Sequence, residues 1–307
     1  MRVMCKLLYG VITMWRLALV AYTISLSVAY AQFNYPDFSS AHNSLILHRD
    51  AAIVGNILRL NPARQYHYST AYHNTPQYLA GGFETFFTFR ISELLYGGAD
   101  GLSFIIAREP FPPIGCCLGY HGIPYSLVVE FDTHQNIYDA GSDPNANHVS
   151  VNTRWELPNS AQHIYSLAIA TPSFALDSGE VIPVRVVYAS GVFSVYVRDL
   201  SQPLIQVSIA ATDLARILDQ CGRAYVGFTG GSGARAENHD ILSWSFTPYG
   251  NPSDVDENGC VDDADLLAVL FAFGQTGGNL GRVDVNCDQV VDDADLLQVL
   301  FNFGSGC

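Results

Sequence analysis

Lysine is all but absent from this chain of 307 residues, because Lys6 is the only one. No segment after the first thirty residues approaches the roughly 18 apolar residues that a membrane-spanning helix needs. Acidic residues outnumber basic ones, for a net charge of −14, and the last 58 residues hold eleven acidic side chains against one arginine. This imbalance excludes nucleic acid as a partner and favours cation binding near the C-terminus.

The N-terminus has the pattern of an export signal. Arg2, Lys6 and Arg16 precede an apolar run at residues 17–28, which is followed by Ala29-Tyr30-Ala31. This order predicts a signal peptide over residues 1–31 and a secreted protein, with a retained membrane anchor as the alternative. The six remaining cysteines then predict disulfides, although the sequence does not reveal how they pair: Cys116, Cys117, Cys221, Cys260, Cys287 and Cys307.

Residues 32–249 consist of short β-type runs divided by Gly, Pro, Asn and Ser. Residues 83–91 alternate aromatic and polar positions, and residues 102–107 form an apolar run suited to a strand covered on both faces. Residues 184–188 and 192–197 flank a hairpin turn, and a helical period occurs only near residues 210–218. The pattern predicts a mainly β fold, an antiparallel sandwich with a full core.

One acidic stretch within this region indicates a metal site. Glu130 and Asp132 are two residues apart at the end of an apolar run, so a strand would project both carboxylates from one face. Asn136, Asp143 and His148 follow on a polar loop. Oxygen ligands suit Ca²⁺, whereas carboxylates combined with the single imidazole suit Mn²⁺ or another transition ion. Two adjacent sites that share Asp132 and Asp143 would use all five groups.

Three ordered motifs resemble the L-type, or legume-like, lectins. They are EFDTHQN at 130–136 followed by the Asp-Pro and His above, GADGLSF at 98–104, and VGFTG at 226–230 continuing to HDILSWSF at 239–246. The resemblance implies a concanavalin-like jelly roll. It implies that Glu130 and His148 hold Mn²⁺, that Asp132 and Asp143 bridge both ions, and that Asn136 and the His134 carbonyl complete the Ca²⁺ site.

The same resemblance implies a sugar site beside the metals. In that family the Asp of the GADG motif follows a cis peptide and accepts hydrogen bonds from sugar hydroxyls, so Asp100 is the expected ligand, with Asn136 as an amide donor. Backbone from Gly233 and Ala234 would supply a variable loop. Two departures leave the sugar's identity open. Cys116 or Gly115 stands where the family has a glycine N–H donor, and His134 replaces an aromatic platform under the sugar ring. Cys116 and Cys117 could pair with each other, or one of them could reach Cys221.

Residues 250–307 contain two near-copies of one unit, thirty residues apart. Each copy has a calcium-loop pattern followed by a predicted helix, with carboxylate or amide oxygens at positions 1, 3, 5, 9 and 12 and a backbone carbonyl at position 7. The expected ligands are Asp254, Asp256, Asn258, Cys260, Asp262 and Asp265 in the first loop, and Asp284, Asn286, Asp288, Val290, Asp292 and Asp295 in the second. Gln289 replaces the usual glycine of the second loop, which predicts a weaker site there.

These repeats lack the entering helix of an EF-hand, since Pro252 lies where it would be. They resemble a dockerin, which docks onto a cohesin module. We expect Asp263-Ala264 with residues 266–269 in one copy, and Asp293-Ala294 with residues 296–299 in the other, to present equivalent docking faces. A calcium-stabilised tail without a cohesin partner is the rival interpretation.

The predicted function is therefore metal-dependent carbohydrate binding by a secreted, non-catalytic protein with a dockerin-like tail. A glycoside hydrolase on the same sandwich is one alternative, but its E-x-D-x-E motif would need a third acid where this chain has His134. The other alternative is a protein-recognition sandwich that has lost sugar binding.

Overall fold

The structure is a computed structural model that describes residues 33–114, 117–137 and 142–307. The predicted signal peptide and Cys116 lie outside these residues. Within the described ranges, no helix has both the length and the apolar character to cross a membrane.

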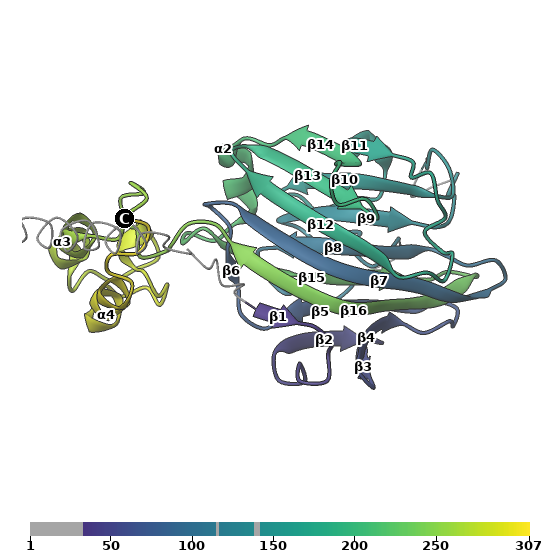
Figure 1. The fold of residues 1–307 in the computed structure, drawn as a ribbon, viewed down its shortest axis with the longest axis horizontal. Helices are drawn as coiled ribbons and strands as arrows, with labels where there is room; N and C mark the ends of the chain where they lie inside the picture. Colours follow the sequence, from purple (N-terminus) through teal and green to yellow (C-terminus); the bar gives the residue numbers. More distant parts are fainter. Residues whose placement is uncertain (1–32, 115–116, 138–141) are drawn as a thin grey trace, which may run out of the picture. The chain divides into compact units, whose positions relative to one another are not determined.

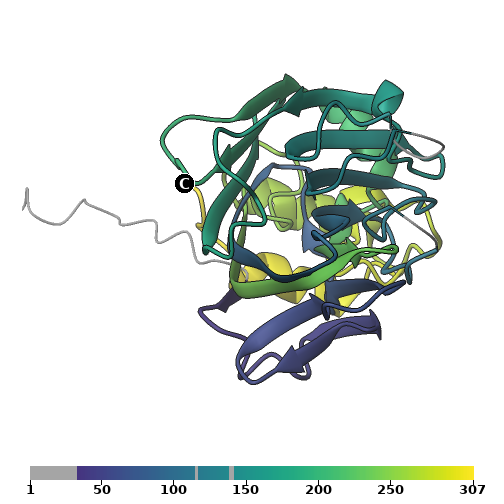
Figure 2. The same ribbon diagram turned by 90° about the vertical axis from the view of Figure 1, so that its right-hand side faces the viewer.

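Two antiparallel sheets form the main body, and their strands can be followed in Figure 1 and, turned by 90°, in Figure 2. The first sheet runs in the order β14 (Ile205–Ser208), β13 (Val192–Val197), β12 (Ile182–Ala189), β7 (Phe83–Leu95), β16 (Ala236–Pro248), β4 (Ile57–Asn61) and β3 (Ala52–Val54), and β1 (Phe33–Tyr35) also pairs with β16. The second runs in the order β11 (Ser166–Ala170), β10 (His148–Trp155), β9 (Ser126–Asp132), β8 (Gly101–Ala107), β15 (Arg223–Gly231), β5 (Tyr68–His73) and β2 (Leu45–Arg49), and β6 (Gln77–Tyr78) also pairs with β15. The predicted antiparallel β-sandwich is confirmed.

Aromatic rings fill the space between the sheets. Strand β7 alternates as predicted, burying Phe83, Phe87 and Phe89. The ring of Phe87 packs against Phe104 of β8 and Phe228 of β15, with centroid separations of 5.8 and 5.0 Å. Each fully buried side chain of this size contributes about 1.5–3 kcal/mol to folding.

Strands β8 and β9 are buried at all seven of their positions, so the outer face of their sheet is covered too. A second apolar cluster lies there, in which Ile105 and Val128 pack with Leu118, Tyr120 and Ile123 from the preceding loop. This double cover explains why residues 102–107 form a continuous apolar run. It also places the acidic end of β9 in a dry environment.

The sandwich also contains short helical segments. Helix α2 (Ala211–Leu214) continues into the 3-10 turn η2 (Ala215–Ile217), where the helical period was predicted. A further turn, η1 (His163–Tyr165), between β10 and β11 was not predicted.

The C-terminal repeats form helices α3 (Asp263–Ala272) and α4 (Asp293–Phe301), with the turn η3 (Gly281–Val283) before the second loop. Their common core holds Val261 and Val269 of the first copy with Val291 and Val299 of the second. The expected docking face is therefore partly wrong, because Val269 and Val299 are buried. Leu267 and Leu297 of the expected faces are exposed, and the other exposed large apolar side chains are Leu270, Phe271 and Phe273 in one copy and Leu300, Phe301 and Phe303 in the other.

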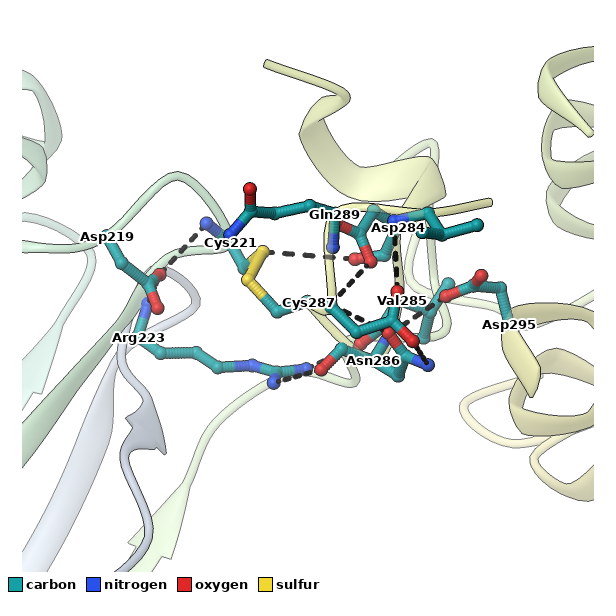
Figure 3. The surroundings of a disulfide bond; sticks show 11 residues. Asp219, Cys221, Arg223, Asp284, Val285, Asn286, Cys287, Gln289 and Asp295 are labelled. Atoms are coloured by element: carbon teal, nitrogen blue, oxygen red, sulfur yellow. Dashed lines mark hydrogen bonds between the residues drawn. A yellow bond between two sulfur atoms is a disulfide. The ribbon is translucent and has the colours of Figure 1, made fainter. Parts of the chain in front are cut away.

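A disulfide joins the sandwich to the second repeat. Cys221, in the turn before β15, is bonded to Cys287 within the loop before α4, as Figure 3 shows. Arg223 donates from the sandwich side to the carbonyls of Val285 and Asn286. The proposed reach of Cys116 or Cys117 to Cys221 is therefore wrong. A second disulfide, Cys260–Cys307, lies within the repeats.

Candidate functional site

Strand β9 delivers two carboxylates to one place, as its alternation predicted. In the ladder with β10, Asp132 lies opposite His148 and Glu130 lies opposite Ser150. The predicted metal ligands Glu130, Asp132 and His148 are all buried. Glu130 and Asp132 are 1% and 2% exposed, and His148 is fully buried.

Hydrogen bonds fix the orientation of Glu130. Its Oε2 accepts from the Tyr120 hydroxyl and from Asn152 Nδ2, the latter at 2.7 Å. Its Oε1 is left facing His148 Nε2 at 3.3 Å. Burial opposes protonation of His148, but the Glu130 carboxylate outweighs that effect and raises the pKa of the imidazole.

The predicted loop brings a third carboxylate to the end of β9. The Asp143 amide donates to the Asn136 carbonyl at 3.1 Å, and Asp143 Oδ2 accepts from the Asn136 amide. Asp132, Asp143 and His148 offer ligand atoms that lie within 4.8 Å of one another. Burial, followed by the charges of Glu130 and Asp143, raises the pKa of Asp132 well above its ordinary value.

A second imidazole approaches this cluster, in addition to the single one that the sequence indicated. Glu130, His148 and His163 also offer ligand atoms within 4.8 Å of one another, and His163 Nε2 lies 3.2 Å from Asp143 Oδ1. His163 is part of η1, which follows β10 in the chain. No local motif marks it, because its approach depends on the path of the chain after β10.

These groups suit divalent cations. Three carboxylates gathered in a buried space repel one another and are poorly solvated, unless positive charge lies between them. Carboxylate oxygens together with imidazole nitrogens form a donor set for a transition ion, and the oxygens that remain suit Ca²⁺. The predicted ligands Glu130, Asp132, Asp143 and His148 lie in this cluster, and they are the residues that would hold such ions.

The predicted sugar ligand lies beside this cluster. The Ala99–Asp100 peptide is cis, the Asp100 amide donates to Gly231, and the Asp100 carbonyl accepts from Thr133. Asp100 is 9% exposed. Burial raises its pKa to about 6; the charge of His239 opposes the rise, and those of Glu237 and Asp143 add to it.

Two buried residues of β16 support this loop and were not singled out from the sequence. Glu237 accepts from Thr133 Oγ1, and its Oε1 lies 3.1 Å from His239 Nε2. A Cβ on Gly98 would come within 2.3 Å of Glu237 Oε2. Glu237 therefore packs directly against the Gly98-Ala99-Asp100 loop. Only the HDILSWSF motif marks this part of the strand.

Of the remaining predicted sugar contacts in the described part of the chain, Gly233 is the one that lies against Asp100. A Cβ on Gly233 would lie 3.8 Å from Asp100 Oδ2, so this loop is adjacent to the carboxylate. The Ala234 carbonyl accepts from Gln65 Nε2. The His134 amide donates to Asp132 Oδ1 at 2.7 Å, and the imidazole is partly buried. Cys116 lies outside the described residues.

The two C-terminal loops repeat one hydrogen-bond pattern. Asp254 accepts from the amides of Asn258 and Gly259, and Asp284 accepts from those of Asp288 and Gln289. Gln289 adopts φ 72°, the left-handed conformation that its position requires.

The last carboxylate of each loop closes it in the same way. Asp265 and Asp295 are fully buried and accept from amides at both ends of their loops, and Asp262 and Asp292 cap the following helices. The ligand atoms of Asp254, Asp256 and Asp265 lie within 4.8 Å of one another.

Comparison with known proteins shows which family the sandwich resembles. Residues 30–260 match the family described as "Legume lectin domain". A seed lectin of Styphnolobium japonicum is 28% identical over 283 residues, which cover 80% of this chain and 87% of that protein. A Lotus tetragonolobus seed lectin of known structure has a TM-score of 0.57 at 26% identity, and basic winged bean lectin, solved with Tn-antigen, has 0.57 at 27%. Each comparison covers 70% of this chain and 96% of the other.

Proposed function

The chain belongs to the legume lectin family, and we propose that its sandwich binds a glycan at Asp100 with the help of bound Ca²⁺ and a transition ion. The relatives that it resembles are carbohydrate-binding proteins and not enzymes. Asp100 would accept hydrogen bonds from two sugar hydroxyls, and Asn136 would donate to one of them. His134 would lie under the sugar ring.

One observation supports this proposal above the others: Asp100 is joined directly to the metal cluster through the backbone. Thr133, which follows Asp132 in the chain, donates to the Asp100 carbonyl at 3.1 Å. In the ladder of β8 and β9, Gly101 lies opposite Asp132. A movement of β9 after metal loss would therefore displace the loop that holds Asp100. Metal binding and sugar binding are coupled in this way.

A glycan array probed with the full chain tests the proposal. We expect binding in the presence of Ca²⁺ and Mn²⁺, loss of binding after exhaustive chelation, and recovery when the ions are restored. The array should include N-acetylgalactosamine glycans, because the relative from winged bean was solved with Tn-antigen. A demetallated protein that binds equally well would contradict the metal requirement. A protein that binds no glycan in either state would favour the protein-recognition alternative.

We further propose that the protein is secreted and that residues 250–307 form a calcium-dependent, dockerin-like docking module. The two helices expose matching apolar side chains, with Phe271 and Phe301 85% and 83% exposed. Such a paired apolar surface suits a protein partner of the cohesin type. Each loop gathers carboxylates whose repulsion opposes closure until Ca²⁺ neutralises them.

Calorimetric titration of the calcium-stripped full chain tests the docking module. We expect the loop of Asp284 to bind Ca²⁺ more weakly than the loop of Asp254, because Gln289 occupies the position where Gly259 stands in the first copy. The Gln289→Gly variant should bring the two affinities together. Equal affinities in the wild type would contradict this account. A cohesin pull-down with Phe271→Ser and Phe301→Ser then tests the surface.

A further inference from the structure

We propose that His163 is a direct ligand of the transition ion, and that its pairing with His148 makes this a two-histidine site that favours Zn²⁺ over Mn²⁺. The inference rests on the proposed function only in that a divalent ion binds among Glu130, Asp132 and Asp143. The resemblance to known lectins implied a site with one imidazole, so this chain departs from that arrangement.

The position of His163 suits a ligand. The centroid of its ring lies 4.7 Å from that of His148, with the two rings edge to face, and its side chain is 8% exposed. His163 Nε2 lies 3.2 Å from Asp143 Oδ1, and His148 Nε2 lies 3.3 Å from Glu130 Oε1. Two ligands at right angles, each about 2.1 Å from an ion, are about 3 Å apart. The two nitrogen–oxygen distances, 3.2 and 3.3 Å, match the distance between neighbouring ligand atoms of one ion.

The hydrogen bonds behind His148 fix its tautomer. His148 Nδ1 lies 2.9 Å from the carbonyl of Asn145, which can only accept, so Nδ1 has the proton. Once a metal ion displaces any proton from Nε2, that atom presents a lone pair to the cluster, as a metal ligand does.

A relay of three side chains fixes His163 in the same way. Asn152 Nδ2 donates to Glu130, so Asn152 Oδ1 is an acceptor, and it accepts from the Ser166 hydroxyl. The Ser166 proton is thereby used, and Ser166 Oγ must accept from His163 Nδ1 at 2.9 Å. His163 Nε2 is left with a lone pair that faces Asp143.

Both Nε2 atoms are buried, and neither has a hydrogen-bond partner within the described part of the chain. Each instead faces a carboxylate oxygen about 3 Å away, so at both places a neutral imidazole sets two electron-rich atoms against each other unless a proton or a metal ion lies between them. A cation between them removes the repulsion and satisfies all four atoms. The relay through Ser166 and Asn152 holds the second imidazole as outer partners hold ligands in metal sites.

The donor set decides which ion is favoured. Imidazole suits Zn²⁺, Cu²⁺ and Ni²⁺, whereas carboxylate and water suit Mn²⁺, and affinities rise from Mn²⁺ towards the end of the series. A second nitrogen therefore increases the preference for Zn²⁺ beyond that of a one-histidine site.

Pulsed EPR of the full chain loaded with Mn²⁺, in excess Ca²⁺, counts the bound imidazoles directly. We expect two in the wild type and one in His163→Ala. Zn²⁺ affinity, measured by competition with a chromogenic chelator, should fall at least about tenfold in His163→Ala, and Mn²⁺ affinity should fall less. The exposed His42→Ala is the matched control and should change neither quantity.

One imidazole in the wild type would overturn the proposal, even if His163→Ala failed to fold. Unchanged Zn²⁺ affinity in a folded His163→Ala protein would overturn it too, and would leave His163 as a neighbour of Asp143 that binds no ion. Glycan binding measured on the same samples separates this inference from the proposed function. Two imidazoles without glycan binding would refute only the lectin proposal, and glycan binding with one imidazole would refute only the assignment of His163.

Discussion

At the scale of single residues, Asp100 combines a buried position with a polar task. Its backbone is held by Gly231 and Thr133, so the side chain contributes little to the fold and is available for a ligand. The pKa of about 6 reflects burial and the neighbouring acids, which an adjacent Ca²⁺ would offset.

Replacing Asp100 by Asn should abolish glycan binding and leave the fold intact. The amide presents a donor where the sugar hydroxyls need an acceptor, and a charged hydrogen bond contributes about 1.5–3 kcal/mol, or tenfold to more than a hundredfold in affinity. Titration calorimetry measures the loss, and Glu180→Gln, on an exposed turn, is the control. Wild-type binding by the Asp100→Asn protein would show that the sugar lies elsewhere.

Gly233 should control access to Asp100. The methyl group of Gly233→Ala would meet Asp100 Oδ2 at 3.8 Å, an ordinary contact, so we expect weak effects on binding. The longer side chain of Gly233→Leu would extend over the carboxylate and block the sugar, with an unchanged melting temperature because the site is at the surface. Normal binding by Gly233→Leu would mean that the sugar does not approach along this loop.

At the scale of elements, strand β9 pairs with β8 and β10 and brings buried carboxylates against a histidine. Raised pKa values at Asp132 and His148 mean that the folded, metal-free protein retains protons that the unfolded chain has released. The stability that these two groups contribute is then highest at low pH and falls as the pH rises, from about 4 for the aspartate and from about 6.5 for the histidine.

The metal-free protein should accordingly lose stability between pH 4 and 8, whereas Ca²⁺ and Mn²⁺ should stabilise it more as the pH rises, because the ions displace those protons. Melting temperatures recorded across this range, with and without chelator, provide the measurement. The melting temperature of the metal-free Asp132→Asn protein should depend less steeply on pH. A metal-free melting temperature that climbs with pH would contradict this account.

At the scale of the whole molecule, the sandwich and the C-terminal repeats are joined by more than the short segment that follows β16, residues 249–252. The Cys221–Cys287 bond and the contacts of Arg223 attach the loop of the second repeat to the turn before β15 (Figure 3). Cys287 lies between the expected calcium ligands Asn286 and Asp288, so this bond restrains the second loop directly.

Cleavage in the linker should leave the two parts attached. With a protease site inserted within residues 249–252, we expect the wild-type fragments to migrate together under non-reducing conditions and to separate on reduction. The Cys221→Ser, Cys287→Ser protein should separate without reductant and lose roughly 3–5 kcal/mol of stability in the repeats. The matched control, Cys260→Ser with Cys307→Ser, should stay joined. Separation of the wild-type fragments without reductant would disprove the bond.

The sequence by itself determined the sandwich, the carboxylate pair of β9 and the two C-terminal repeats, and the resemblance of its GADG motif to a known family implied the cis peptide before Asp100. Strand alternation and loop spacing are local properties, so Glu130 and Asp132 could be placed on one face without knowledge of their neighbours. Only the tertiary structure decided that His163 enters the metal cluster, that Glu237 lies beneath the Asp100 loop, and that Cys221 reaches Cys287. Those contacts depend on how strands register across a sheet and where the chain turns afterwards, and a periodic pattern does not encode either of these.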